Sequence, residues 1–347
     1  MRWLRPFPAS AERLHRNLFK RGQKRLLATS LRGTRDMASV TRSPAVTVVA
    51  VTHNSADVLP GLVESLEAGM VGTTWELVVV DNASTDQSAE LAGGLMPSAT
   101  VVRSERNGGY AAGINLGVAS ARPADAILVL NPDVRLEPGC AATLAAALDD
   151  PAVGMAAPHL VDGSGDLVHS IRREPTLLRM LADALMGATR AGRIGSLGEV
   201  ATDPGAYTRR QVVDWAEGST LLIDMDCWRR VGSWDESFFL YSEETDYALR
   251  VRDAELCVVY VPEARAVHLK GGSAVSTSLW PLLATNRWRL YRKRHGTAAG
   301  AVFWAVLVLR EGTRAALGRP VSRAAFRALL SPRRLRQEPG PEWIAAR

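Results

Sequence analysis

One aspartate stands where a buried strand ends, in a position from which a carboxylate can bind a ligand. The segment AILVLNPDVRLEPG (126–139) begins as an apolar run, typical of a buried strand, and stops at Asn131, Pro132 and Asp133. A lone Asp at a strand end is most often a turn or cap residue. Asp133 is not alone, because three earlier apolar runs also end in polar residues. A carboxylate at such an edge can bind a divalent metal ion that bridges a diphosphate.

The three earlier apolar runs end in side chains that can bind a ligand through oxygen or nitrogen. Thr52, His53 and Asn54 follow the first run, Asp81 and Asn82 the second, and Asn107 the third. Neither Gly-x-Gly-x-x-Gly nor Gly-x-x-x-x-Gly-Lys follows the first run, so the usual nucleotide-binding loops are missing. Asn107, Gly108 and Gly109 open a predicted helix, where small residues let backbone N–H groups approach an anion. An ordinary turn is the alternative.

Alternating strands and helices would bring these residues to one edge of a sheet. Strand-like runs lie at 45–51, 76–81, 100–103 and 126–130, and helical patterns at 57–68, 86–95, 109–121 and 138–148. Because the strands are continuously apolar, we expect an α/β fold with a mostly parallel sheet flanked by helices. Ligands bind beyond the carboxyl ends of such strands. Later strands and one helix, at 212–224, 238–253 and 257–268, would complete a mixed sheet in the same domain.

Charged residues are unevenly distributed along the 347-residue chain, whose net charge is +6. Residues 1–36 carry a net charge of +8 and residues 287–347 carry +11, whereas residues 37–286 carry −13. Basic ends suit an anionic membrane surface, because each Lys or Arg near anionic lipid contributes on the order of 1 kcal/mol. Solvated tails are the alternative. Nucleic acid is disfavoured, since no nucleic-acid-binding module is recognisable.

Cysteine content and apolar patterning limit where the protein works. Cys140, Cys227 and Cys257 form no Cys-x-x-Cys pair, which indicates a reducing compartment rather than a disulfide or zinc framework. The N-terminus lacks the apolar core of a secretory signal, so residues 1–43 are expected to be a basic tail or an extension upstream of the true start. The apolar segment 298–309 has roughly half of the ~20 residues that span a bilayer, and the Arg-rich sequence after it favours an interfacial helix.

Six blocks of sequence, in their order and spacing, resemble the inverting glycosyltransferases of family 2, which have the GT-A fold. They are VTVVAVTHNSADVLPGLVESL, ELVVVDNASTDQS, ERNGGYAAGINLG, LVLNPDV, FFLYSEETDYALR and VPEARAVHLKGGS. The resemblance covers residues 44–275 and leaves 276–347 as a basic, helical C-terminal region. Within the family the blocks are most similar to the rhamnosyltransferases that use dTDP-rhamnose and a GlcNAc-diphosphoryl-polyprenol acceptor. This implies a hexosyltransferase of cell-envelope polysaccharide synthesis.

The resemblance implies a metal site and a donor site at the predicted edge. Asp133 matches the last acid of the family's Asp-x-Asp motif, and His268 matches the histidine that binds the same ion. An oxygen site with one imidazole favours Mn²⁺ or Mg²⁺ over zinc, whereas a structural histidine is the alternative. Asp81 would accept a hydrogen bond from the imide N–H of uracil or thymine, with turn capping as its alternative. The residues implied in nucleotide binding are Thr52, Asn54, Asp81, Asn82, Asn107, Gly108, Gly109 and Asn131.

The segment SEETDYALR (242–250) resembles the family's Glu/Asp-Asp-x-Asp motif, which makes Glu244 the implied catalytic base. Glu replaces the usual Asp, so Glu243 stays an alternative. Glu244 would take the proton from an acceptor hydroxyl as this oxygen attacks the anomeric carbon. Asp246 and Arg250 are spaced i, i+4 and are predicted to form a structural ion pair.

The segment WAEGSTLLI (215–223) resembles the part of the family that lies under the donor sugar and the acceptor. It implies sugar or acceptor contacts for Trp215, Glu217 and Gly218, to which Glu243 is added. A Trp beside a strand is more often part of the core, which is the alternative for Trp215.

The implied partners are a nucleotide-diphosphate sugar, a glycan or polyprenyl-diphosphate-linked acceptor and an anionic membrane surface. They place the protein in the cytoplasm, peripheral at the inner face of the cell membrane. A UDP-sugar is the alternative donor. A nucleotidyltransferase would need a Gly-rich basic loop after the first strand, which VTHNSADVLPG does not offer. A non-catalytic sugar- or nucleotide-binding protein of this fold is a third interpretation, which the joint presence of Asp133, Glu244 and His268 disfavours.

Overall fold

The structure is a computed structural model that describes residues 45–269 and 276–343. The strands in these ranges are β1 (Val46–Thr52), β2 (Trp75–Asp81), β3 (Thr100–Arg103), β4 (Ala126–Leu130), β5 (Val134–Leu136), β6 (Val153–Val161), β7 (Ile171–Arg172), β8 (Gln211–Val213), β9 (Trp215–Ala216), β10 (Thr220–Asp224) and β11 (Cys257–His268). The α-helices are α2 (Leu59–Gly69), α3 (Ser88–Leu95), α4 (Tyr110–Ala119), α5 (Cys140–Ala145), α6 (Leu177–Met186), α7 (Ala188–Arg193), α8 (Met225–Val231), α9 (Glu243–Asp253), α10 (Leu279–Ala316), α11 (Pro320–Leu329) and α12 (Pro332–Arg336). The predicted N-terminal tail, residues 1–43, lies outside the described residues.

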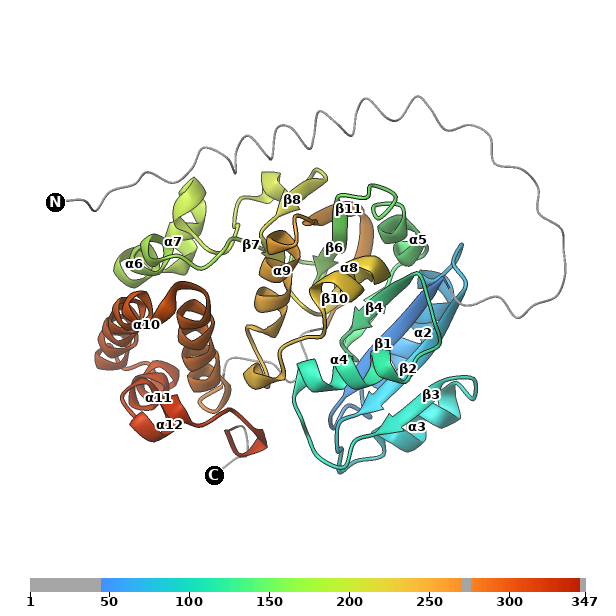
Figure 1. Cartoon of the computed structure of the whole chain (residues 1–347), viewed down its shortest axis with the longest axis horizontal. Coiled ribbons are helices and arrows are strands. Elements are labelled where there is room, and N and C mark those ends of the chain that lie inside the picture. Colours follow the sequence, from blue (N-terminus) through green and yellow to red (C-terminus); the bar gives the residue numbers. More distant parts are fainter. Residues whose placement is uncertain (1–44, 270–275, 344–347) are drawn as a thin grey trace, which may run out of the picture.

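One large mixed sheet forms the centre of the molecule (Figure 1). Its strand order is β3-β2-β1-β4-β10-β6-β11-β5, and β8 pairs with β11. Because β1 is parallel to β2 and β4, and β2 is parallel to β3, the carboxyl ends of these four strands lie at one edge, as predicted. β10 runs antiparallel to its neighbours β4 and β6, whereas β11 runs parallel to β6. The expected mixed α/β sheet is confirmed.

Alternation along the strands divides the core between two helix layers. Val48 and Ala50 of β1 belong to a cluster with residues of α2 and α5, whereas Val49 and Val51 belong to a cluster with residues of α4 and α9. Successive side chains of a strand point to opposite faces, so both faces of β1 are buried. This explains why β1 and β4 are continuously apolar in the sequence, whereas β3, at the edge of the sheet, is only partly buried.

The predicted strands are confirmed where apolar runs are strong, and one interior strand was missed. β6 lies between β10 and β11 in the sheet, but its sequence VGMAAPHLV contains three residues, Gly154 and two alanines, that disfavour strands, and also Pro158. The predicted helix over 138–148 is shorter: α5 begins at Cys140, after Gly139 with a left-handed φ of 71°, and ends at Ala145.

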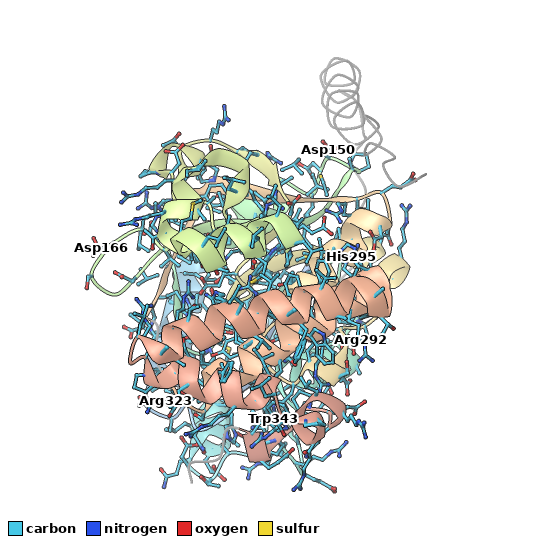
Figure 2. All side chains as sticks on the ribbon, turned by 90° about the vertical axis from the view of Figure 1, so that its left-hand side faces the viewer. Asp150, Asp166, Arg292, His295, Arg323 and Trp343 are labelled. Atoms are coloured by element: carbon cyan, nitrogen blue, oxygen red, sulfur yellow. The ribbon has the colours of Figure 1, made fainter. Side chains whose placement is uncertain are left out.

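The C-terminal region folds as a compact set of helices beside the sheet (Figures 1 and 2). α10 turns sharply at Gly296, whose φ of 81° is a left-handed value that favours glycine. The two halves of α10 pack together: Tyr291 stacks on Phe303 with ring centroids 4.1 Å apart, and the Trp288 indole N–H donates to the Gly300 carbonyl over 3.1 Å. α6 and α11 pack against α10.

The apolar segment 298–309 lies in the second half of α10 and has both a core face and an open face. Phe303 and Leu307 are fully buried, whereas about half of Val302 and Leu309 is exposed, 54% and 53%. In the part of the chain that the structure describes, no helix is both long and apolar enough to cross a bilayer. The three cysteines are free thiols.

Candidate active site

Asp133 and His268 meet beyond the carboxyl end of β4. Asp133 lies in the turn between β4 and β5, and His268 is the last residue of β11, which pairs with β5. The Leu269 N–H donates to the Asp133 carbonyl oxygen over 3.0 Å, which ties the two chain segments together. The His268 Nε2 lies 3.3 Å from Asp133 Oδ1, and both side chains are buried. The structure therefore brings together the two residues that the sequence assigns to a metal ion.

Glu217 contacts the other nitrogen of the His268 ring. Its Oε1 lies 3.0 Å from His268 Nδ1, and its Oε2 lies 3.9 Å from a guanidinium nitrogen of Arg172. Burial lowers the pKa of His268, but the hydrogen bonds and charges of Asp133 and Glu217 outweigh burial and raise this pKa to about 9. Carboxylates beside metal-binding histidines commonly fix the orientation of the ring. Glu217 can fill this role and leave Nε2 facing Asp133.

The pair of Asp133 and His268 fits a divalent metal ion that is also bound by phosphate oxygens. A carboxylate oxygen and an imidazole nitrogen suit Mn²⁺ or Mg²⁺, and Asp133 Oδ1 and His268 Nε2 lie 3.3 Å apart. Within residues 45–269 and 276–343, no group of three or more His, Cys, Asp or Glu side chains could hold a metal by itself. The other ligands of such an ion would have to be diphosphate oxygens and water, as is usual for Mg²⁺.

Helix α9 begins with Glu243 and Glu244, after a loop with an unusual backbone. Phe239, Tyr241 and Ser242 have φ values of 61°, 69° and 78°, and each left-handed non-glycine residue costs about 1–3 kcal/mol. Ser242 stands at the N-cap position, but its side chain makes no hydrogen bond to the helix. Strain of this kind persists only where the surroundings hold the backbone in place.

The two glutamates differ in burial and therefore in ionisation. Glu243 is 3% exposed, and its burial, together with the charge of Glu244, holds its pKa well above the ordinary value. Glu244 is partly exposed, and burial, opposed by backbone N–H groups and by the charge of Arg172 but aided by that of Glu217, raises its pKa to about 7. Burial and the charge of Glu244 thus favour the neutral form of Glu243, whereas Glu244 is close to its titration midpoint near neutral pH. Glu244 therefore suits the role of a general base.

Tyr110 lies close enough to Glu243, Glu244 and Asp133 to be influenced by their charges. Burial, followed by the charges of Glu243, Glu244 and Asp133, raises its pKa well above the ordinary value. Its hydroxyl donates to the Gly218 carbonyl over 3.2 Å, and a Cβ at Gly218 would lie only 3.1 Å from the Glu244 Cβ. Tyr110 was missed by sequence reasoning, although its place at a helix start after two glycines was a signal. It connects the metal-binding side of the site with the base.

Thr52 and Asp81 stand opposite each other at the ends of β1 and β2. The Thr52 hydroxyl donates to Asp81 Oδ1 over 3.4 Å, and both residues are buried. The Ser84 N–H donates to Asp81 Oδ2 over 3.3 Å. Asp81 therefore caps the following turn and also lies at the edge where a base is expected.

Asn82 organises the turn that precedes α4. Its Nδ2 donates to Asn107 Oδ1 over 3.0 Å and to the Gly109 carbonyl over 2.9 Å, and its Oδ1 accepts from the Gly108 N–H over 3.0 Å. The Gly109 N–H donates to Asn107 Oδ1 over 3.0 Å. Four predicted donor-binding residues thus form one hydrogen-bonded unit, in which the two asparagines position the glycine backbone.

Three other predicted residues have different surroundings. Asn54 is exposed, and its side-chain oxygen accepts from the Thr85 N–H over 2.8 Å. Asn131 is partly exposed at the end of β4. Trp215 is 8% exposed, and its indole N–H donates to the Arg173 carbonyl over 3.0 Å. The Trp215 ring is therefore part of the core and offers little surface to a sugar.

Asn286 of α10 holds the loop before α9. Its fully buried amide donates to three carbonyl oxygens of the loop, those of Phe238, Leu240 and Tyr241, over 2.6, 2.9 and 3.1 Å. From the other side the Tyr110 N–H donates to the Phe239 carbonyl over 2.8 Å, and a Cβ at Gly109 would lie 2.2 Å from that oxygen. The strained loop is thus fixed from two elements. The sequence of α10 carries no motif that could have identified Asn286.

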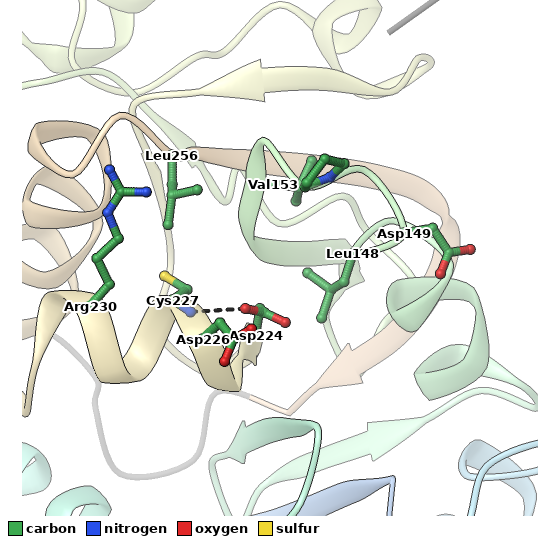
Figure 3. A pocket seen from close by; sticks show the side chains of 9 residues that line it. Leu148, Asp149, Val153, Asp224, Asp226, Cys227, Arg230 and Leu256 are labelled. Carbon is green, nitrogen blue, oxygen red and sulfur yellow. Dashed lines mark hydrogen bonds between the residues drawn. The ribbon is translucent and has the colours of Figure 1, made fainter. Parts of the chain in front are cut away.

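A hollow of about 320 Å³ at the opposite edge of the sheet is separate from this site (Figure 3). One of its lining residues, Asp224, pairs with Ala126 at the beginning of β4, whereas Asp133 follows the end of that strand. Asp224 Oδ1 accepts from the Cys227 N–H over 2.8 Å and so caps α8. Helix capping explains this carboxylate.

Comparisons with known proteins bear on the family and the fold. Residues 47–214 match the family model described as Glycosyl transferase family 2. The chain is 29% identical over 239 residues to an N-acetylglucosaminyl-diphospho-decaprenol L-rhamnosyltransferase of Mycobacterium tuberculosis, an alignment that covers 65% of this chain and 76% of that protein. It is 26% identical over 266 residues to rhamnosyltransferase WbbL of Escherichia coli, covering 72% and 94% of the two chains.

A solved structure supports the fold. The mannosyltransferase PcManGT from Pyrobaculum calidifontis, in complex with GDP-Man and Mn²⁺, is similar with a TM-score of 0.51 and 17% identity. The match covers 94% of this chain and 91% of that one. The family match, the relatives and the shared sheet architecture lead to one assignment: residues 47–214 belong to glycosyltransferase family 2, and the sheet has the GT-A fold.

Proposed function

We propose that the protein is an inverting rhamnosyltransferase that moves rhamnose from dTDP-rhamnose to a hydroxyl of a polyprenyl-diphosphate-linked glycan in cell-envelope synthesis. The observation that carries this proposal is the gathering of Asp133, His268 and Glu244 around Tyr110 and Glu217. Two relatives are rhamnosyltransferases by name, and one is named for a GlcNAc-diphospho-decaprenol substrate.

Glu244 acts as the general base in this mechanism. It takes the proton of the acceptor hydroxyl while that oxygen bonds to the anomeric carbon and the bond from this carbon to the donor diphosphate breaks. Attack on the face opposite the leaving group inverts the configuration. Burial raises the pKa of Glu243 and favours its neutral form, which leaves Glu244 as the base of the pair.

Asp133 and His268 would hold Mn²⁺ or Mg²⁺, which stabilises the negative charge of the departing nucleoside diphosphate. Glu217 keeps the His268 ring oriented. Asp81 accepts a hydrogen bond from the imide N–H of the base, and because thymine and uracil both carry this group, a UDP-sugar is the second candidate donor.

We also propose that the protein works in the cytoplasm, attached to the inner face of the cell membrane. Leu178, Leu181 and Leu185 share one face of α6 and are 61%, 40% and 72% exposed. Arg190 and Arg193 of α7 follow them and are exposed. An apolar helix face beside arginines suits an anionic bilayer surface.

A panel of dTDP- and UDP-sugars, tested with a short-chain GlcNAc-diphospho-polyprenol acceptor, examines the proposal. We expect product from dTDP-rhamnose and from no other donor of the panel. The reaction should require Mn²⁺ or Mg²⁺ and stop when EDTA is added. NMR of the product should show an inverted anomeric configuration. Transfer from a UDP-sugar alone would select the second donor. Donor binding without turnover of any sugar would instead indicate a non-catalytic binding protein, and retained configuration would refute direct displacement.

A further inference from the structure

A groove of about 900 Å³ lies between the C-terminal helices and Ser237–Phe238. Both halves of α10, the end of α11 and the α12 region form its walls. Its volume is within the ~300–1,000 Å³ of typical ligand sites. None of the residues assigned to the donor, the metal or the base lines it. Any ligand in the groove would therefore be a different molecule from the donor, or a part of the acceptor that lies away from the reacting atoms.

The floor of the groove is aromatic and aliphatic. Trp288, Trp304, Leu329 and Leu335 line it, and the Trp304 indole N–H is satisfied by the Leu329 carbonyl over 2.8 Å. Leu330, which is 48% exposed, extends the apolar surface towards solvent. Such a floor binds hydrocarbon and offers few polar groups to a sugar or a base.

The rim of the groove is cationic, with four basic side chains and one acidic one. Lys293 lies 2.6 Å from Asp235 and 2.7 Å from Asp246, and Arg289 donates to backbone carbonyls near the end of α12, so both are used within the protein. Arg292 and Arg336 are exposed and form no ion pair within the described ranges.

The free cations stand next to the apolar floor. The Arg292 guanidinium carbon lies 5.0 Å from the centroid of the Trp288 ring, which is part of that floor. A ligand that bridges rim and floor must therefore carry an anionic group directly attached to a hydrocarbon chain. An arginine fork suits phosphate oxygens better than a single carboxylate.

The groove is joined to the catalytic base by a short segment. Phe238 lines the groove, and α9 with Glu243 and Glu244 begins after the strained loop that follows it. Asn286, which holds this loop, lies one turn of α10 before Arg289. An occupant that reaches Phe238 thus lies beside the loop that carries the base.

We propose that this groove binds the lipid carrier of the acceptor, with the diphosphate at Arg292 and Arg336 and the first isoprenoid units on Trp288, Trp304 and Leu330. The inference rests on the proposed function and deepens it, because it places the part of the acceptor that remains unchanged in the reaction. An isoprenoid diphosphate combines the two chemistries that rim and floor require. The sugar, attached to the diphosphate, extends past Phe238 towards α9.

The site is tested by calorimetry, which measures the binding of farnesyl diphosphate to the full-length protein in the presence of EDTA. EDTA removes the metal that could otherwise hold a diphosphate at Asp133. We expect Arg292→Glu/Arg336→Glu to weaken binding at least roughly tenfold, the loss expected for two charge-assisted contacts. Arg323→Glu is the matched control, because Arg323 is exposed on α11, does not line the groove and lies away from Arg292 in Figure 2.

A further variant separates loss of the site from loss of folding, and a set of ligand analogues identifies the ligand. Glu338→Gln removes the one acid of the rim and should tighten binding. Farnesol, without diphosphate, and inorganic pyrophosphate, without the chain, should each bind at least roughly tenfold more weakly than farnesyl diphosphate. The protein could also bind vesicles of anionic phospholipid as tightly as farnesyl diphosphate and lose both to the same extent in the double variant. This result would assign the groove to bilayer lipid and overturn the proposal. So would equal effects of the double variant and Arg323→Glu.

Kinetics separate failure of this site from failure of the proposed function. With GlcNAc-diphospho-farnesol as acceptor, the double variant should raise the KM for the acceptor about tenfold and leave the KM for the donor unchanged. Transfer with an unaltered acceptor KM would refute the groove and retain the function. Absence of transfer to every lipid acceptor, with farnesyl diphosphate binding still lost in the double variant, would refute the function and retain the lipid site.

Discussion

Two adjacent glutamates have different surroundings in the fold. Glu243 is 3% exposed and burial raises its pKa well above the ordinary value, whereas Glu244 packs against Gly218, is partly exposed and has a pKa of about 7. Helix geometry turns neighbours about 100° apart, so the two side chains meet different neighbours. This difference in burial favours Glu244 as the proposed base.

Replacing Glu244 by Gln should reduce kcat at least roughly 100-fold, because a positioned general base contributes about 10²–10⁴-fold. The affinity for the donor, measured by calorimetry with metal present, should stay the same. Glu243→Gln is the matched control, since it places a neutral amide of similar shape where burial favours the neutral form of the carboxyl, and it should retain most of the activity. The reverse ranking of the two variants would move the base to Glu243.

The pH dependence follows from the pKa of Glu244. Its ionised form is the active one, so kcat/KM should rise about tenfold per pH unit below pH 7 and level off above it. The folded-state pKa of about 7 exceeds the ordinary value of 4.5, so the folded protein binds more protons than the unfolded one between these values. Its free energy of unfolding should then fall as pH rises through this window. Melting curves at pH 5 and pH 8 should show a loss that is smaller in Glu244→Gln, and an equal loss in both proteins would contradict the raised pKa.

At the scale of elements, the start of α9 depends on helices that are distant in the chain. The loop with left-handed Phe239, Tyr241 and Ser242 cannot hold itself, because its cap side chain is unused. Asn286 of α10 and the Gly109 turn before α4 supply the hydrogen bonds and the close fit. The helix that contributes the base is positioned by its neighbours.

Replacing Asn286 by Ala should lower kcat about tenfold or more while the donor KM stays the same, because three carbonyl oxygens of the loop lose their donor and the loop relaxes. The pKa that governs kcat/KM should also fall from about 7 as Glu244 gains solvent. Thr285→Val is the matched control: it removes a fully buried hydroxyl that bonds only within α10, to Pro281 and Leu282 carbonyls. The control should lower the melting temperature without moving the pH midpoint. A midpoint that stays at about 7 in Asn286→Ala would refute the positioning role.

At the scale of the molecule, much of the charge asymmetry along the chain is used internally. The predicted pair of Arg250 and Asp246 is confirmed, with Nε 2.8 Å from Oδ2, and Lys293 from the basic C-terminal region lies 2.7 Å from the same carboxylate. Arg294 pairs with Asp253 at 2.9 Å, and Arg314 pairs with Asp183 at 2.9 Å. An acidic body and a basic C-terminal region thus dock on each other, which leaves fewer arginines of the described C-terminal residues available to a membrane.

Membrane attachment should depend on the apolar face of α6. Replacing Leu178 and Leu185 by Asp should reduce sedimentation with anionic liposomes at least roughly tenfold, because each buried leucine contributes about 1.5–3 kcal/mol. Val71→Asp/Leu95→Asp is the matched control, since these residues are 61% and 42% exposed on the sheet side of the molecule, outside α6. Equal sedimentation of the two variants would exclude α6 as the attachment surface.

The sequence alone determined the layout of the first half of the sheet and the residues at its edge. Continuous apolar runs define strands that are buried on both faces, and the polar residues that follow them must lie at the carboxyl edge. Asp133, Asp81 and Thr52 could therefore be placed without coordinates. Strand β6, with its alanines and Pro158, shows the limit, because its pairing with β10 and β11 overrides weak local propensity.

Only the tertiary structure decided how distant residues combine. The contact of Glu217 with His268, the hold of Asn286 on the loop and the groove between Phe238 and the C-terminal helices all join segments that are far apart in the chain. The different burial of Glu243 and Glu244 follows from the same packing. Local patterns specify strands and helices through propensity and periodicity. Burial, pKa and hydrogen-bond partners arise from packing between elements, so local sequence patterns do not specify them.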